Sequence, residues 1–281
     1  MCGITGFIRF PGTNKESDQQ LLTQMVQTLY HRGPDESGQD IHQGVAMGMR
    51  RLSIIDLGGG TQPIYNEDGT VWTVFNGEIY NFPELKEQLQ ARGHVFTTNS
   101  DTEVIVHGYE EWGPDVVCHL NGMFGIALHD LRNQKVLLAR DHLGIKPLYF
   151  AYQQDRLIFG SEIKALLASN WIKKDIDYTG LADFMSWEYI PGRSTLLEGV
   201  EKLLPGEVLC LSLNSPSCQP HKFWDIPPAS QEGPDTSSED WEERILAQVQ
   251  KSTRMQMISD VPLGAFLSGG VDSSLIAAAM G

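Results

Sequence analysis

The sequence begins MCGITGF, which places a cysteine directly after the initiator methionine. Methionine is removed when the next side chain is small, so we expect the mature chain to begin with Cys2. A thiolate is a strong nucleophile, but a thiol with a pKa of about 8.5 is only slightly ionised at neutral pH. An α-amine, with a pKa of about 7.7–8.0, can accept the thiol proton directly or through a water. Cys2 would then supply both nucleophile and base; a small residue merely tolerated after methionine is the simpler alternative.

A second stretch that could do chemistry is SGGVDSS at residues 268–274. It follows an apolar run at residues 261–267, predicted to be a strand, and it opens a predicted helix at residues 274–280. Glycines let a backbone approach a phosphate closely, while serine hydroxyls and the free N–H groups of a helix N-terminus bind its charge. The Walker A pattern is absent, so γ-phosphate transfer is not implied. A plain strand-to-helix turn of small residues is the alternative.

The SGGVDSS loop resembles the pyrophosphate loop of ATP-pyrophosphatases, enzymes that adenylate a carbonyl oxygen and release pyrophosphate. The resemblance implies that ATP is a co-substrate, that the loop holds its pyrophosphate, and that Asp272 helps to coordinate Mg²⁺. It assigns the nucleotide site to Phe266, Ser268, Gly269, Gly270, Asp272, Ser273 and Ser274. Phe266 departs from the aliphatic residue that usually precedes this loop, and its bulk would alter nucleotide affinity if it lies behind the adenine.

Further motifs follow Cys2 in order along the first part of the chain. They are HRGPDESG (31–38), RRLSIIDL (50–57), NGEIYN (76–81), SDTE (100–103) and RDHLGIKPLYF (140–150). Together with MCGI they resemble class II glutamine amidotransferases, which hydrolyse glutamine to ammonia with an N-terminal nucleophile. Joined to SGGVDSS, they resemble the B-type family of glutamine-hydrolysing asparagine synthetases. Gly125 and His129 depart from that pattern, since alanine and a hydrophobic or aromatic residue are commoner at these positions.

The resemblance implies a glutamine site built from the N-terminal motifs. Cys2 attacks the side-chain amide carbon, while the amide of Asn76 and the backbone N–H of Gly77 stabilise the oxyanion. Loss of one such donor typically costs about 2.7–4 kcal/mol. Arg51 grips the α-carboxylate with its guanidinium fork, and Asp101 holds the α-ammonium group. The other residues expected to line the pocket, through backbone contacts, are Leu52, Ser53, Ile54, Ile55 and Glu78.

Each of these residues also has a purely structural interpretation. Arg51 could lie on the surface of a strand, Asp101 could cap a helix, and Asn76 with Gly77 could form only a hairpin turn. Taken together and in the family's order, the motifs favour the glutamine site. His31 is different: an amine base makes a histidine base unnecessary, so we interpret HRGPD as a loop-forming segment.

The combined resemblance implies an ATP-dependent carbon–nitrogen ligase. Aspartate and ATP form β-aspartyl-AMP and pyrophosphate, and ammonia from glutamine then displaces AMP. The alternative is the same two-site mechanism applied to a different carboxylate, in a natural-product or cell-envelope pathway; we expect the acceptor pocket to lie beyond residue 281. The SGGVDSS loop disfavours sugar-phosphate chemistry. A binding module without catalysis is disfavoured by the presence of Cys2 with Arg51, Asn76 and Asp101.

Helices and strands must position these motifs. Apolar periodicity predicts helices at residues 17–30, 83–92, 102–112 and 239–257, the first with a Ser17/Gln20 capping box. Strands are predicted at residues 45–49, 70–75, 124–131, 135–140, 147–152 and 156–161. Because strands outnumber helices without βαβ alternation, we expect antiparallel sheets with helices outside. The resemblance makes this an α/β protein with a four-layer α/β/β/α N-terminal nucleophile hydrolase fold.

A change in composition marks a linker at residues 214–238. The resemblance makes residues 1–213 a glutaminase domain and residues 239–281 the start of an α/β ATP-pyrophosphatase domain. The linker is rich in proline, serine and acidic residues. A nucleotide site in an open α/β sheet is built from several strand ends. We therefore expect the 281 residues to hydrolyse glutamine at most, and not to make asparagine.

Bulk composition limits the partners of the chain. With 41% hydrophobic and 20% charged residues, no signal peptide and no long apolar run, it is predicted to be globular and cytoplasmic, without a membrane partner. A net charge of −15 without a Lys/Arg cluster argues against nucleic acid. The cysteines, at positions 2, 118, 210 and 218, lack metal or disulfide spacing and are expected to be reduced. The expected ligands are glutamine, aspartate, ATP and Mg²⁺, and the resemblance leaves a homodimer open.

Overall fold

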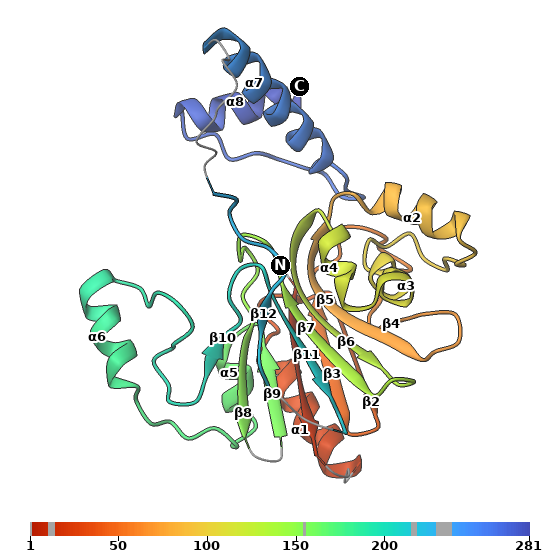
Figure 1. The fold of residues 1–281 in the computed structure, drawn as a ribbon, viewed down its shortest axis with the longest axis vertical. Helices are drawn as coiled ribbons and strands as arrows, with labels where there is room; N and C mark the ends of the chain where they lie inside the picture. Colours follow the sequence, from red (N-terminus) through yellow and green to blue (C-terminus); the bar gives the residue numbers. More distant parts are fainter. Residues whose placement is uncertain (1, 11–14, 154–155, 215–217, 229–237) are drawn as a thin grey trace. The chain divides into compact units, whose positions relative to one another are not determined.

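The computed structural model describes residues 2–10, 15–153, 156–214, 218–228 and 238–281. The chain divides into two compact units, Met1–Asp225 and Ile226–Gly281 (Figure 1). Each unit is described by itself. Of the predicted linker at residues 214–238, residues 215–217 and 229–237 lie outside the described part of the chain.

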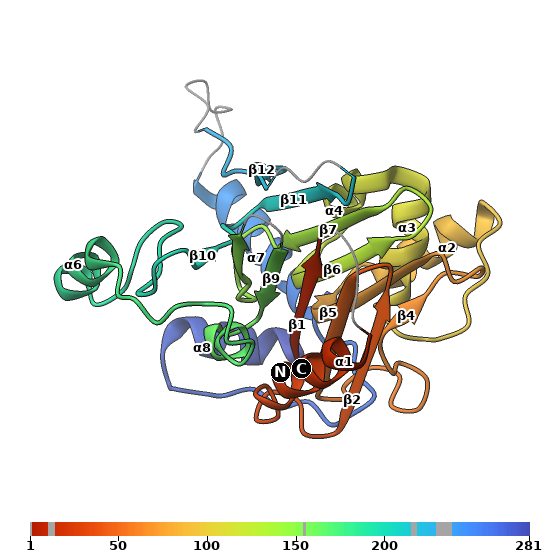
Figure 2. The ribbon, with the colours of Figure 1, turned by 90° about the horizontal axis from the view of Figure 1, so that it is seen from below.

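Two antiparallel six-stranded sheets form the frame of the first unit (Figures 1 and 2). The first sheet has the order β10 (Glu201–Lys202), β8 (Tyr149–Gln153), β9 (Arg156–Gly160), β1 (Gly3–Arg9), β3 (Val45–Arg51), β2 (Glu36–His42). The second has the order β12 (His221–Lys222), β11 (Glu207–Ser212), β7 (Lys135–Arg140), β6 (Gly122–Asp130), β5 (Val71–Ile79), β4 (Ile64–Tyr65). The N-terminal strand β1 is therefore central in its sheet, hydrogen-bonded to β9 on one side and β3 on the other.

Apolar side chains fill three layers, one between the sheets and one on each outer face. The layer between the sheets includes Ile4, Met47, Trp72, Val74, Leu138 and Phe159. On the outer face of the first sheet lie α1 (Lys15–Gln27) and α5 (Ile163–Leu167). The second sheet is covered by α2 (Phe82–Ala91), α3 (Glu103–Trp112) and the short α4 (Val116–His119), which follows the 3-10 turn η1 (Gly113–Asp115). The predicted four-layer α/β/β/α arrangement is thus confirmed.

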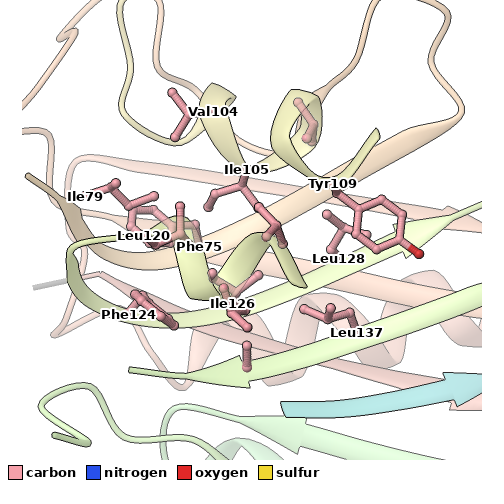
Figure 3. Close-up of a cluster of buried hydrophobic side chains, with 14 of the residues drawn as sticks. Phe75, Ile79, Val104, Ile105, Tyr109, Leu120, Phe124, Ile126, Leu128 and Leu137 are labelled. Atoms are coloured by element: carbon pink, nitrogen blue, oxygen red, sulfur yellow. The ribbon is translucent and has the colours of Figure 1, made fainter. Parts of the chain in front are cut away.

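Helix α3 is the element that joins the second sheet to the functional cavity described below. Its residues 104–109 are buried without interruption, and Figure 3 shows Ile105 and Tyr109 beside Ile126, Leu128 and Leu137 of the sheet. A helix buried over most of its length has little freedom to move along the sheet, because every displacement would expose apolar surface or create a void. The residues that directly precede α3, Ser100, Asp101 and Thr102, are buried as well.

Strand β5 is longer than the sequence predicts. It continues from Val71 to Ile79, past the predicted end at residue 75, because β6 pairs with it along its whole length. The NGEI segment therefore lies in a sheet.

Helix α1, predicted at residues 17–30, ends earlier at Gln27, and consecutive turns follow it up to Gly33. A side chain on Gly33 would collide with the backbone of Arg50, at 2.3 Å, so the chain reaches β3 there only with glycine.

The second unit contains α7 (Ser238–Met255) and α8 (Val271–Met280), which contact each other. The predicted strand at residues 261–267 is wrong: a strand needs a hydrogen-bonded neighbour, and none lies beside it in the described part of this unit. Helix α8 begins at Val271, earlier than predicted, and Ser274 N donates to the carbonyl of Gly270 at 3.1 Å. Phe266 is fully exposed. Among the described helices, none combines the length and apolarity that a membrane crossing requires.

The first unit also contains helix α6 (Tyr178–Trp187), which has Asp177 as its N-cap.

Leu138 tests the importance of the layer between the sheets. Leu138→Ala should lower the free energy of unfolding by about 2–5 kcal/mol, because it removes buried methyl groups and leaves a cavity. Urea titration followed by circular dichroism measures the change, and Leu143→Ala, at a leucine that is 66% exposed, is the matched control. Equal transition midpoints for the two variants would contradict the assignment of this layer as the core.

Candidate functional site

The residue before β1, the end of β3 and the second half of β5 line one cavity of ≈ 150 Å³. Its lining residues are Cys2, Arg51, Leu52, Ile54, Ile55, Gln62, Phe75, Asn76, Gly77, Glu78, Ser100, Asp101, Thr102, Met123 and Lys146. Most of the residues predicted for glutamine binding and catalysis are therefore brought together. Strands β3 and β5 belong to different sheets, so the cavity depends on how the two sheets pack.

Cys2 directly precedes β1 and is held from two sides. Arg32 Nε donates a hydrogen bond to the Cys2 carbonyl oxygen at 2.8 Å, and the Leu52 N–H donates to Sγ at 3.4 Å. Burial raises the pKa of the Cys2 thiol above its ordinary value, although the N–H of Leu52 and the charge of Arg51 act in the opposite direction. The thiol is consequently protonated at neutral pH, and its reaction as a nucleophile requires a base.

Asn76 and Gly77 lie within β5, so the interpretation of this pair as a hairpin turn is wrong. A Cβ on Gly77 would come within 2.0 Å of the Met123 carbonyl oxygen, so the close approach of β6 requires glycine here. The Asn76 side chain is fully buried. Its Nδ2 lies 3.5 Å from Ser161 Oγ, and its Oδ1 has no hydrogen-bond partner in the part of the chain that the structure describes. A buried amide with unused hydrogen-bonding capacity is costly, which favours a ligand that completes it.

Arg51 is buried at the end of β3 and is not a surface residue of the strand. Its Nη2 donates to the carbonyl oxygens of Ile55 and Asp56 at 2.7 and 2.9 Å, and its Nη1 lies 3.1 Å from Glu36 Oε2. These contacts fix the plane of the guanidinium group. A fixed guanidinium group beside a cavity suits a carboxylate ligand, because both groups are planar and bidentate.

Two carboxylates, the buried Asp101 and the half-buried Glu78, face the same cavity. Asp101 Oδ2 accepts the N–H of Ile79 at 2.9 Å, and the N-cap of α3 is Thr102, so Asp101 is not a helix cap. Burial raises the pKa of Asp101 to about 6, although the hydrogen bond from Ile79 lowers it. Burial and, to a smaller extent, repulsion from Asp101 raise the pKa of Glu78 to about 7, whereas the charge of Lys146 lowers it. An ammonium group bound beside these carboxylates would stabilise their charged forms.

Lys146 and Gln62 line the cavity, but the sequence analysis did not single them out. Lys146 is buried, and burial lowers its pKa although the charge of Glu78 raises it. The sequence signal for this residue is its position between Ile145 and Pro147, inside the RDHLGIKPLYF motif that belongs to the family resemblance. Gln62 Oε1 accepts the N–H of Phe75 at 2.7 Å and so supports β5, a role with no local signal in the sequence.

Two residues considered in the sequence analysis lie outside the cavity lining. Ser53 stands between the lining residues, and its N–H donates to Asp35 Oδ2 at 2.9 Å. The exposed His31 has its Nε2 2.9 Å from Glu162 Oε1. Its position agrees with the interpretation of HRGPD as a loop-forming segment.

The predicted nucleotide loop lies in the second unit. Ser268 Oγ is 2.9 Å from Ser273 Oγ, and Gly269 has a φ of +82°, which favours glycine. Helix α8 has Gly270 as its N-cap, without a side-chain cap, so its first N–H groups are available to an anion. Asp272 lies in the first turn, where one carboxylate can bind Mg²⁺ together with phosphate oxygens. The residues present therefore fit a magnesium-bound phosphate chain.

The charges beside Cys2 can be tested through its reactivity. Burial and then the Asp101 carboxylate raise the pKa of Cys2, while Arg51 lowers it. Because the thiolate is the reacting form, Asp101→Asn should shift the pH of half-maximal iodoacetamide alkylation downward, and Arg51→Gln should shift it upward. Mass spectrometry resolves the alkylated peptides, and the exposed Cys118 serves as the internal control. Identical Cys2 profiles in all three proteins would contradict this electrostatic arrangement.

Family models and curated relatives match both units. A model described as a glutamine amidotransferase domain matches residues 1–224, and one described as asparagine synthase matches residues 244–281. The chain is 38% identical to glutamine-hydrolysing asparagine synthetase 3 of Bacillus subtilis over 99% of its own length and 45% of that protein. It is also 38% identical to asparagine synthetase 1 of the same organism, over 98% and 43% of the two chains. The chain thus spans less than half the length of these relatives.

A solved structure shows a similar fold. The glutamine phosphoribosylpyrophosphate amidotransferase of B. subtilis, solved with ADP and GMP, superimposes with a TM-score of 0.58 at 16% identity, over 99% of this chain and 64% of the other. At this identity the similarity is evidence for the fold alone, and the shared fold agrees with the predicted fold class. The predicted resemblance to glutamine-hydrolysing asparagine synthetases is confirmed. Since the amidotransferase model matches 224 of 281 residues, the chain belongs to the glutamine amidotransferase domain family.

Proposed function

We propose that this chain hydrolyses L-glutamine to glutamate and ammonia at Cys2, and that the whole protein uses the ammonia to amidate aspartate. The observation that carries the proposal is the shared cavity, in which the partly buried thiol of Cys2 lies with Arg51 and Asp101. A thiol alone would fit many reactions. The additional pair of opposite charges suits the α-carboxylate and α-ammonium groups of an amino acid.

The first chemical step forms a thioester. The Cys2 thiolate attacks the side-chain amide carbon of glutamine, and the electron pair of the C=O bond moves onto oxygen. Asn76 Nδ2 and the Gly77 N–H are the proposed donors to this oxyanion, and preorganised donors of this kind are among the largest contributions to catalysis. When the tetrahedral intermediate collapses, the C–N bond breaks, the nitrogen takes a proton, and ammonia leaves.

The second step regenerates the enzyme. Water adds to the thioester carbonyl, the same donors bind the new oxyanion, and the C–S bond breaks to release glutamate and the thiol. The proposed base for both steps is the α-amine of Cys2 after removal of Met1. It is well suited to this role because burial makes the thiol a poor acid, and a neutral amine on the same residue is always within reach.

The proposed synthetase reaction rests on the second unit and on the relatives. The SGGVDSS loop offers α8 N–H groups and the Asp272 carboxylate to ATP and Mg²⁺, which would supply the energy for activating the aspartate carboxylate. The relatives named as asparagine synthetases favour aspartate as the acceptor. A different carboxylate is the second candidate, because a relative named amidase chry2 from Gibberella zeae is 36% identical over 99% of the chain.

Substitution of Cys2 tests the proposed nucleophile. Cys2→Ala should abolish glutamate release from glutamine by the 281-residue chain, and a variant that retains Met1 should be equally inactive, because its amine lies one residue too far away. Cys118→Ala, at an exposed cysteine outside the cavity, is the control. In the whole protein, Cys2→Ala should still form asparagine from added ammonium. Glutamine turnover by Cys2→Ala at the rate of the control would refute the proposal.

Substitution of Arg51 tests substrate recognition. Arg51→Lys keeps the charge but loses the planar fork, so KM for glutamine should rise about tenfold or more, since hydrogen bonds to charged groups contribute about 1.5–3 kcal/mol. The matched control is Arg50→Lys: Arg50 donates to the Gly33 and Pro34 carbonyl oxygens and does not line the cavity. Steady-state kinetics of both variants measure the difference. Equal KM values would place the carboxylate elsewhere.

A further inference from the structure

Four potential metal ligands gather on the second sheet's helical side, outside the cavity of Cys2. They are Glu67, His94, His107 and Glu110, and their ligand atoms all lie within 4.8 Å of one another. Glu67 lies between β4 and β5, His94 follows α2, and the other two lie three residues apart on α3. None of the four lines the Cys2 cavity. The cluster therefore requires an explanation separate from the proposed glutaminase site.

Both histidine rings are oriented by carboxylates outside the cluster. His94 Nε2 lies 3.1 Å from Glu111 Oε1, and His107 Nε2 lies 3.4 Å from the buried Glu103 Oε1. Glu103 is itself fixed, because it accepts hydrogen bonds from the backbone N–H groups of residues 97 and 98. A carboxylate beside Nε2 selects the tautomer that carries its proton on Nε2 and leaves the Nδ1 lone pair free. A metal-binding histidine usually donates its other ring N–H to a carboxylate in this way.

The free Nδ1 atoms face the two remaining carboxylates at distances that suit a shared ion. His94 Nδ1 lies 3.5 Å from Glu67 Oε1 and 3.7 Å from Glu110 Oε2. His107 Nδ1 lies 3.3 Å from Glu67 Oε2 and 3.7 Å from Glu110 Oε2. In a tetrahedral zinc site with bonds of about 2.0–2.1 Å, adjacent ligand atoms are about 3.3–3.4 Å apart. Small side-chain movements would bring all four atoms to that spacing.

The hydrogen bonding at the centre of the cluster is incomplete. Among the described residues, His107 Nδ1 and Glu110 Oε2 are both buried without a hydrogen-bond partner, and the His107 side chain is only 1% exposed. Leaving such groups unpaired is costly, because they lose their hydrogen bonds to water without gaining others. Glu110 Oε1, in contrast, accepts from Asn66 Nδ2 at 2.8 Å, which directs Oε2 toward the histidines. A cation bound between the unpaired atoms would satisfy them.

We propose that Glu67, His94, His107 and Glu110 form a structural Zn²⁺ site. Two neutral imidazoles and two carboxylates balance the charge of one divalent ion, and this set of nitrogen and oxygen ligands suits zinc. Four protein ligands fill a tetrahedral shell and leave no position for substrate, so the site is structural and not catalytic. Glu67 also lines a surface cavity together with Glu103, so this ligand is accessible from solvent.

The bound ion would join three segments of the first unit. It would tie the turn before β5 and the segment after α2 to helix α3. Asp101 lies between the second and third of these segments, two residues before α3 begins. Zinc would therefore hold the loop that carries Asp101, which gives the site a role in ordering the cavity without contact to its ligand.

Zinc binding by the 281-residue chain tests the proposal directly. After EDTA treatment and dialysis, titration with ZnCl₂ against a chromophoric chelator should give one tight site per chain, and the melting temperature should rise with zinc concentration. Co²⁺ in place of zinc should give the intense visible absorption of a tetrahedral site. Absence of a stoichiometric site, or the weak spectrum of octahedral Co²⁺, would overturn the proposal.

Variants distinguish this cluster from other sites. Glu67→Gln and His94→Gln, chosen because they avoid the buried His107, should each lower zinc affinity by more than the about 10–100-fold typical for loss of a second-shell partner. Circular dichroism of the metal-free variants verifies folding. His221→Gln, at an exposed histidine of β12, is the matched control and should bind zinc like the parent chain. Unchanged affinity in Glu67→Gln and His94→Gln would overturn the assignment, whether or not glutamine is hydrolysed.

Discussion

The packing of the two sheets through their apolar inner faces is the constraint on which the cavity depends. Strands β1 and β3 contribute Cys2 and Arg51 from one sheet, whereas β5 contributes Asn76 and Gly77 from the other. A relative shift of the sheets would separate the thiol from these potential donors. The buried layer between the sheets opposes such a shift, because close-packed side chains do not slide without creating voids. The same apolar contacts between the sheets therefore stabilise the fold and hold the cavity residues in position.

The Cys2 cavity is lined by ionisable side chains that burial leaves only partly solvated. Burial raises the pKa of Asp101 to about 6 and, with repulsion from Asp101, the pKa of Glu78 to about 7, while the Arg51 guanidinium group is held by backbone carbonyls. Such groups are costly without a counter-charge, and a zwitterionic amino acid would compensate them.

Helix α3 connects this cavity to the proposed zinc site. Its buried face packs on the second sheet, Asp101 lies just before its N-terminus, and His107 and Glu110 lie further along it. Apolar packing limits displacement of the helix along the sheet but supplies no bond of fixed direction. Directional bonds to a metal ion would add that restraint, and with it a defined position for the segment of residues 94–101.

The family resemblance, the order of motifs and the fold class could be predicted from the sequence, because MCGI, NGEIYN, SDTE and SGGVDSS are local strings that carry the resemblance without any knowledge of the tertiary structure. Only the tertiary structure decided that Asn76 and Gly77 belong to a strand, since pairing with β6 and not local propensity extends β5. It also placed Lys146 in the cavity and gathered Glu67 with His94, His107 and Glu110. These neighbours are far apart along the chain, and their proximity follows from sheet register and helix packing, which no local pattern encodes.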